Sequence, residues 1–92
     1  MILGFRHRAL RRLYEKDDNS RNSPLHIMKI KRILARLDEA SEAQDMSLLG
    51  FTLHPSKGNL AGFWAVKVSR NWRIIFRFEG NNVQDVDLID YH

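Results

Sequence analysis

The sequence predicts an α+β domain in which a short N-terminal strand and two helices pack on one face of an antiparallel sheet. Three observations predict this class. Apolar residues recur at helical spacing in the first half of the chain, they alternate with a period of two after residue 45, and turn residues divide the second half into hairpins. At 92 residues the chain is expected to be one domain, 1–92, with one core.

The first half is predicted to hold one strand and two helices. Residues 2–5 are apolar and short, which suits a strand, and residues 6–16 carry apolar side chains at helical spacing. Turn-forming residues at 17–20 end that helix. The next helix is expected to begin at Ser23-Pro24, because serine caps free N–H groups and proline suits the first helical position. Its apolar stripe runs to about residue 40 or 42.

The second half is predicted to be a series of strands. In the first, Leu49, Phe51 and Leu53 alternate with smaller or polar residues, which indicates a half-buried strand. The others are expected at 63–68, 72–79 and from 83 to 88 or 89, with a loop at 55–59 and turns at 69–71 and 80–82.

Alternation along residues 72–79 assigns the two faces of the sheet. Trp72, Ile74, Phe76 and Phe78 should face one way, and we assign Trp72 to the core. Arg73, Ile75 and Arg77 should face the other way. Because the helices cover one face, we expect the face with the arginines to be left for function, with His54 as a further candidate.

The composition limits the classes of functional site and of binding partner. The sequence has no cysteine, which excludes disulfides, thiolate nucleophiles and iron–sulfur clusters. No apolar run is long enough to span a membrane and the N-terminus lacks the order of a signal peptide, so we expect a cytoplasmic protein. The net charge is +4, and residues 46–78 contain no Asp or Glu. The cations in that stretch, Lys57, Lys67, Arg70, Arg73 and Arg77, favour a phosphate-bearing or acidic partner, although cations also simply solvate strand faces.

These residue types match the needs of RNA cleavage without a metal. A base must take the proton from a 2′-OH, cations must stabilise charge at phosphorus, and an acid must protonate the leaving 5′-oxygen. His54, Lys57, Arg73, Tyr91 and His92 supply these groups. Each has a plain alternative, since a histidine at a strand end is often a surface residue and a C-terminal Tyr-His is often a frayed tail. A metal-dependent nuclease using Asp85 and Asp87 is a further alternative.

Several motifs resemble the HigB toxins of the RelE-like superfamily, which belong to bacterial toxin–antitoxin systems. They are Leu53-His54-Pro55-Ser56-Lys57-Gly58, Gly62-Phe63-Trp64-Ala65-Val66, Asn71-Trp72-Arg73-Ile74-Ile75-Phe76-Arg77-Phe78, Asp85-Val86-Asp87 and Asp90-Tyr91-His92. The opening residues 5–10 and 14–16 resemble the family as well. The resemblance covers essentially the whole chain and implies a RelE-like fold.

The resemblance also implies a function and partners. It implies a ribosome-dependent mRNA endonuclease that enters the decoding site, needs no metal or cofactor, and is neutralised by a helix-turn-helix antitoxin, through which the pair binds operator DNA. Carried over from the family, the active cleft would use His54, Lys57, Asn71, Arg73, Asp90, Tyr91 and His92. We assign catalysis to His54, Lys57, Arg73, Tyr91 and His92 and RNA binding to Asn71 and Asp90. We add Lys67, Arg70 and Arg77 as RNA-binding candidates, because they are the other cations of the predicted strand region. Relatives often carry one more arginine just before the Asn, and Arg70 and Lys67 are the candidates for it here. The alternative is a catalytically weak or inactive homologue that acts as an antitoxin-binding corepressor or an RNA-binding module.

Overall fold

A computed structural model describes residues 1–17 and 26–90. Two α-helices, α1 (Arg8–Lys16) and α2 (Ile27–Glu39), precede a four-stranded sheet. The strands are β1 (His54–Pro55), β2 (Trp64–Lys67), β3 (Trp72–Glu79) and β4 (Asn82–Asp90), and the connections contain two short 3-10 helices, η1 (Ala43–Met46) and η2 (Gly58–Leu60). Neighbouring strands are antiparallel in the order β1-β2-β3-β4. The predicted α+β class is confirmed.

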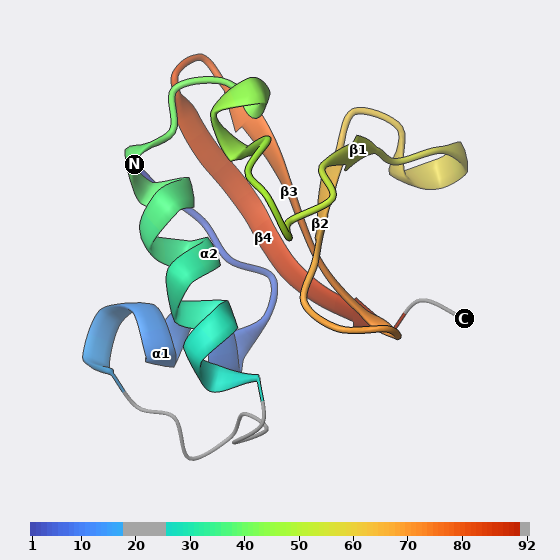
Figure 1. Cartoon of the computed structure of the whole chain (residues 1–92). Coiled ribbons are helices and arrows are strands. Elements are labelled where there is room, and N and C mark those ends of the chain that lie inside the picture. Colours follow the sequence, from blue (N-terminus) through green and yellow to red (C-terminus); the bar gives the residue numbers. More distant parts are fainter. Residues whose placement is uncertain (18–25, 91–92) are drawn as a thin grey trace.

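Both helices lie on the same side of the sheet (Figure 1). Their apolar stripes form the main core together with Val66, Ile74, Phe76, Val83 and Val86 of the strands, all buried. A second, smaller cluster of Phe63, Ala65 and Ile75 lies apart from this core. Among the described residues, no helix is long and apolar enough to cross a membrane.

The N-terminal segment joins the sheet more weakly than a full strand. Ile2 and Phe5 form isolated bridges with Val83 and Val86 of β4, and both bridges are parallel. Figure 1 shows this segment running beside α2 and along β4. The predicted strand at 2–5 is therefore reduced to two bridges, because the chain turns at residue 6 to enter α1.

The helix ends differ by a few residues from the sequence-based expectation. Helix α1 begins at Arg8, where the ring of the capping residue His7 accepts a hydrogen bond from the Leu10 backbone N–H at 3.3 Å. It ends as predicted at Lys16, and its C-cap residue Asp17 adopts a left-handed conformation with φ 53°. Helix α2 ends at Glu39, and the predicted start at Ser23-Pro24 lies outside the described residues.

Two hydrogen bonds to Asp38 tie the N-terminus to both helices. The Tyr14 hydroxyl donates to Asp38 Oδ1 at 2.5 Å, and the Ile2 backbone N–H donates to the same oxygen at 3.0 Å. The hydrogen bond to Asp38 and partial burial raise the pKa of Tyr14 to about 12. The hydrogen bonds from Tyr14 and Ile2 lower the pKa of the Asp38 carboxyl.

The strand predicted at 49–53 is wrong. Residues 49–51 form a turn, and the first strand contains only His54 and Pro55. Leu49 is 99% exposed whereas Phe51 is buried, so the two do not share a buried strand face. Gly50 and Thr52 have φ values of 90° and 51°, which break the extended backbone that alternation requires. Phe51 and Leu53 both pack against the core, but they do so from a turn and the segment that follows it, not from a strand.

The faces of β3 agree with the prediction except at its first residue. Ile74, Phe76 and Phe78 pack with the helices, and Arg73, Ile75 and Arg77 face away. Trp72 is 38% exposed and is not a core residue. It is the first residue of β3, directly after the turn at 69–71, so the assignment of Trp72 to the core is corrected.

Candidate active site

A pocket of about 290 Å³ lies on the face of the sheet away from the helices. Its polar side is made by His54, Ser56 and Lys57, and its floor is apolar: Leu60, Ala65, Ile75 and Ile89. Pro55 completes the lining. The structure therefore brings two predicted catalytic residues, His54 and Lys57, to one cavity.

Strand register explains why these residues meet. His54 pairs with Ala65, Ala65 pairs with Ile75, and Ile75 pairs with Asp87, so these four residues form one row across the same face. Residues that are directly opposite each other in antiparallel strands project to the same side. The small side chain of Ala65 beside His54 leaves the space that becomes the pocket.

The ring of His54 is held by a backbone carbonyl. Its Nδ1 lies 3.1 Å from the carbonyl oxygen of Thr52. A carbonyl can only accept a hydrogen bond, so Nδ1 carries the hydrogen in this contact. In the neutral ring the lone pair then resides on Nε2. The imidazole is thus set up to accept or donate a proton through one defined nitrogen.

Lys57 also lines the pocket, from an exposed turn. It precedes η2 and is followed by Gly58, whose φ of 68° turns the chain. The Lys57 side chain is exposed and lines the cavity. Among residues 1–17 and 26–90, no carboxylate forms an ion pair with Lys57, so its ammonium can meet a phosphate without first losing a partner from that part of the chain.

A second row on the same face carries two more predicted residues. Lys67 pairs with Arg73, and Arg73 pairs with the pocket residue Ile89. The Arg73 guanidinium also organises the adjacent turn, because its Nη1 donates to the carbonyl oxygens of Ser69 at 2.8 Å and Arg70 at 3.3 Å. Arg73 is therefore partly buried and rigidly placed beside the pocket.

The remaining predicted residues lie around this row or beyond it. Arg70 and Asn71 are exposed in the turn between β2 and β3. Asp90 ends β4 opposite Trp72, and the register assigns it to the face of Trp72 and not to that of Arg73. Figure 1 shows this end of β4 beside the β2–β3 turn. Tyr91 and His92 lie outside the described residues.

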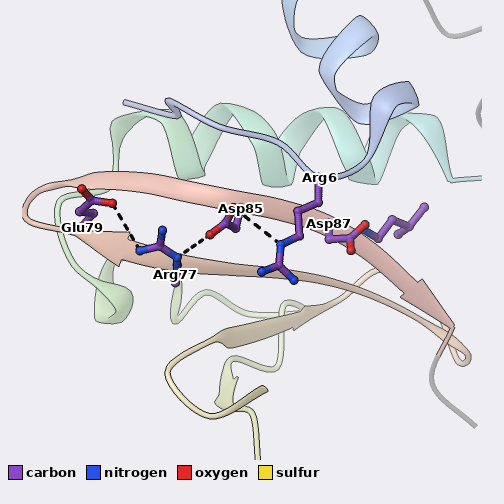
Figure 2. Close-up of polar contacts among 6 residues, drawn as sticks. Arg6, Arg77, Glu79, Asp85 and Asp87 are labelled. Atoms are coloured by element: carbon purple, nitrogen blue, oxygen red, sulfur yellow. Dashed lines mark hydrogen bonds and ion pairs between the residues drawn. The ribbon is translucent and has the colours of Figure 1, made fainter. Parts of the chain in front are cut away.

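Arg77 is the one predicted RNA contact that the structure places elsewhere on this face. It lies four residues from Arg73, about 13 Å along an extended strand. Figure 2 shows it between two carboxylates, with Nε 2.5 Å from Asp85 Oδ2 and Nη1 3.4 Å from Glu79 Oε2. These contacts raise the pKa of Arg77, with the hydrogen bond to Asp85 as the largest cause.

Asp85 itself supports a β-bulge. The register between β3 and β4 shifts between Ile75 and Arg77, and Asp85 adopts φ 55° at this shift. Its carboxylate contacts Arg77 and also Arg6, whose Nε is 3.7 Å away and whose guanidinium lies 5.0 Å from the Phe63 ring centroid. Among residues 1–17 and 26–90, no three or more His, Cys, Asp or Glu side chains are grouped so that they could hold a metal ion.

Sequence reasoning missed the apolar floor and the carbonyl behind His54. Ile75 between two outward-facing arginines was the available signal, because an isoleucine on a supposedly solvated face needs a cover. In the structure that cover comes from Leu60 of η2 and from Ile89 of β4. The left-handed conformation of Thr52 had no sequence signal, because threonine disfavours it.

Comparison with known proteins identifies the family of the chain. A family model described as "RelE-like toxin of type II toxin-antitoxin system HigB" matches residues 3–92. The chain belongs to the HigB-like toxin family. The resemblance found in the sequence is confirmed, and a toxin of a type II system has an antitoxin as its partner.

Two known proteins are similar to this HigB-like toxin over their whole length. It is 34% identical over 92 residues to Endoribonuclease HigB from Proteus vulgaris, and the match covers 100% of both chains. The solved structure of a YoeB/ParE toxin from Agrobacterium tumefaciens is similar with a TM-score of 0.63 and 18% sequence identity. That similarity covers 100% of this chain and 99% of the other, and it supports the RelE-like fold alone.

Proposed function

We propose that this HigB-like toxin is an endoribonuclease that cuts mRNA held on the ribosome, without a metal, by attack of a 2′-OH on the neighbouring phosphate. The observation that carries the proposal is the pocket itself. It joins a histidine of defined tautomer and an exposed lysine, and Arg73 flanks it in the next row of the sheet. The full-length similarity to Endoribonuclease HigB supports the same activity.

The proposed reaction exchanges one bond to phosphorus for another. Nε2 of neutral His54 takes the 2′-OH proton while the 2′-oxygen forms a bond to phosphorus. The bond from phosphorus to the 5′-oxygen breaks, and that oxygen is protonated by a general acid, for which His92 is the sequence-based candidate. The products are a 2′,3′-cyclic phosphate and a 5′-hydroxyl. Lys57 and Arg73 stabilise the extra negative charge on the phosphorus centre.

The apolar floor has a role in this proposal. Leu60, Ile75 and Ile89 offer a surface for a base or ribose to cover. Such a contact would exclude water and strengthen the electrostatic contacts of the cations with phosphate. The site offers few catalytic groups, so it depends on a substrate that is already aligned. A ribosome that presents the mRNA in a fixed path would supply that alignment.

The test is the cleavage of end-labelled mRNA with and without ribosomes. We expect cleavage only of ribosome-bound mRNA, with 2′,3′-cyclic phosphate ends, and none when the ribose before the scissile phosphate is 2′-deoxy. Equal cleavage of the 2′-deoxy mRNA would overturn 2′-OH attack. Equal cleavage of free mRNA would overturn ribosome dependence. No growth arrest and no cleavage by the wild type would favour the non-catalytic antitoxin-binding alternative.

A further inference from the structure

Two cationic side chains and one backbone N–H group meet at the two-residue segment Gly50–Phe51, outside the pocket. Lys29 of α2 donates from Nζ to the Gly50 carbonyl oxygen at 2.9 Å. Arg32, one turn further along α2, places its guanidinium 5.9 Å from the Phe51 ring centroid. Lys67 donates its backbone N–H to the Phe51 carbonyl oxygen at 2.6 Å. Residues from a helix and a strand thereby gather at one corner of the sheet.

This corner exists because β1 is short. β1 pairs only with Trp64 and Ala65, and the rest of the β2 edge is covered by Phe51. The loop at 49–53, which the sequence pattern predicted as a strand, therefore links α2 to β2. Phe51 is buried and fixes the loop, so the cations around it have a rigid base.

The three cations lack acidic partners within the part of the chain that the structure describes. Neither Lys29, Arg32 nor Lys67 forms an ion pair with a carboxylate there. Other cations of the fold do form such pairs: Lys31 meets Asp17 at 2.6 Å, and Arg11 meets Glu15 at 3.2 Å. A basic group without an acid beside it raises the local attraction for anions.

Electrostatics at Lys29 agree with this arrangement. Burial lowers the pKa of Lys29, and the nearby charges of Arg32, Lys67 and Arg73 lower it further. Like charges held together cost free energy in the unbound protein. An anion that binds among them relieves that repulsion.

We propose that Lys29, Arg32 and Lys67 form a binding subsite for an RNA backbone phosphate, separate from the scissile one. This inference rests on the proposed function and extends its binding surface. Lys67 lies directly opposite Arg73, so the subsite continues the row that flanks the pocket. It would hold a nucleotide beyond the cleavage point or a phosphate of ribosomal RNA.

RNA fits this corner better than an acidic peptide does. The subsite is contiguous with the catalytic face, and an RNA strand that places one phosphate in the pocket must carry the next ones across the neighbouring surface. Phosphates of a single strand recur at a few ångströms, so one strand can occupy both sites. Lys and Arg both suit this purpose because each binds phosphate oxygens.

The experiment measures binding of a short fluorescent single-stranded RNA, 2′-O-methylated to prevent cleavage, by anisotropy over a range of salt. For single strands the slope of log affinity against log salt becomes shallower by about 0.7 for each phosphate that the protein no longer neutralises. We expect Lys29→Gln and Lys67→Gln each to reduce the slope by up to about that amount, and Lys29→Arg to restore it. Arg36→Gln, the same kind of charge removal at the other end of α2, is the control and should leave the slope unchanged.

A parallel arm uses small ribosomal subunits without mRNA. Weaker binding of Lys29→Gln to the RNA strand assigns the phosphate to mRNA, and weaker binding to the subunits assigns it to ribosomal RNA. Both results support the subsite. If neither binding nor slope changes, or if Arg36→Gln changes them equally, the proposal is overturned.

Two readouts separate the subsite from other causes. A purely structural role for Lys29 as a loop clasp would lower the melting temperature of Lys29→Gln and leave both the salt slope and the binding to small subunits at their wild-type values, which would overturn the proposal. His54→Ala should lose cleavage and keep the wild-type slope. If the wild type cuts no RNA and Lys29→Gln still lowers the slope, the subsite stands and the proposed enzymatic function fails.

Discussion

Nδ1 of His54 lies 3.1 Å from the carbonyl oxygen of Thr52, two residues earlier in the chain. The contact depends on a local backbone reversal, because Thr52 adopts φ 51°, where a β-branched residue is strained. The strain is offset by the burial of Phe51 on one side and by the pairing of β1 on the other. A backbone group thereby fixes the tautomer of the proposed base.

Removing the imidazole should abolish most of the cleavage. We expect His54→Ala to reduce the single-turnover rate constant by about 10²–10⁴-fold, the usual contribution of general acid–base catalysis. Added imidazole should restore part of the missing rate in His54→Ala and have no effect on the wild type. A His54→Ala protein that cleaves at the wild-type rate would remove His54 from the mechanism.

Phe51 and Leu49 should differ sharply in their effect on stability. Phe51→Ala should lower the free energy of unfolding by about 3–5 kcal/mol, because it leaves a cavity under the loop. Leu49→Ala should change it by no more than about 0.5 kcal/mol, since that side chain is exposed. Urea denaturation of both variants measures these changes in the free energy of unfolding. Similar losses of stability in the two variants would contradict the loop at 49–53 and favour the strand that the sequence pattern predicted.

The sequence predicted most of the fold because local patterns and packing agree there. The stripe of α2 and the alternation of β3 both bury the residues that their periods select. Prediction failed at 49–53 because Leu49 is exposed and two left-handed residues, Gly50 and Thr52, separate Phe51 from Leu49 and Leu53. It failed at Trp72 because alternation assigns a face but not the extent of the helices that cover it.

The candidate site was predictable in its residue types and not in its assembly. His54, Lys57 and Arg73 could be named from the chemistry and from motif resemblance. Their meeting depends on the register that opposes His54 to Ala65, and pairing register is a long-range property of the sheet. The same limit applies to Arg77, since its partner Asp85 is brought to it by a bulge that the alternating pattern of β4 does not reveal.

Removing the charge of Asp85 should lower the stability of the protein and have little effect on the cleavage rate. Asp85→Asn tolerates the left-handed backbone but loses the ion pairs with Arg77 and Arg6, which are partly exposed. We expect the melting temperature of Asp85→Asn to fall slightly and the cleavage rate to stay within about threefold of the wild type. Loss of cleavage in a folded Asp85→Asn protein, recovered by raising the magnesium concentration, would favour the metal-dependent alternative.

The hydrogen bond from Tyr14 to Asp38 should give stability over a defined pH window. Tyr14→Phe should lower the free energy of unfolding by about 1–2 kcal/mol near neutral pH, as expected for a hydrogen bond to a charged group that is partly exposed to solvent. The contribution of Asp38, whose pKa is lowered on folding, is present above 3.8 and is lost as the pH falls through the folded value. That of Tyr14, whose pKa is raised to about 12, is present below 10.0 and is lost as the pH rises through the folded value.

Urea denaturation of the wild type and Tyr14→Phe across pH measures this window. The difference between the two proteins should be constant from about pH 5 to 9 and should shrink on either side. A difference that grows as the pH falls below 4 would contradict the assignment of the hydrogen bond to an ionised Asp38.

The most direct test of the central claim, that one face of the sheet cuts RNA, compares the removal of two arginines. Single-turnover cleavage of ribosome-bound mRNA should fall by at least about 100-fold in Arg73→Ala, as for the removal of a group that stabilises transition-state charge. It should stay near the wild-type rate in Arg36→Ala, which removes the same charge from α2, remote from the pocket. Equal rates for the folded Arg73→Ala and Arg36→Ala proteins would contradict the proposal that the row beside the pocket acts on the phosphate.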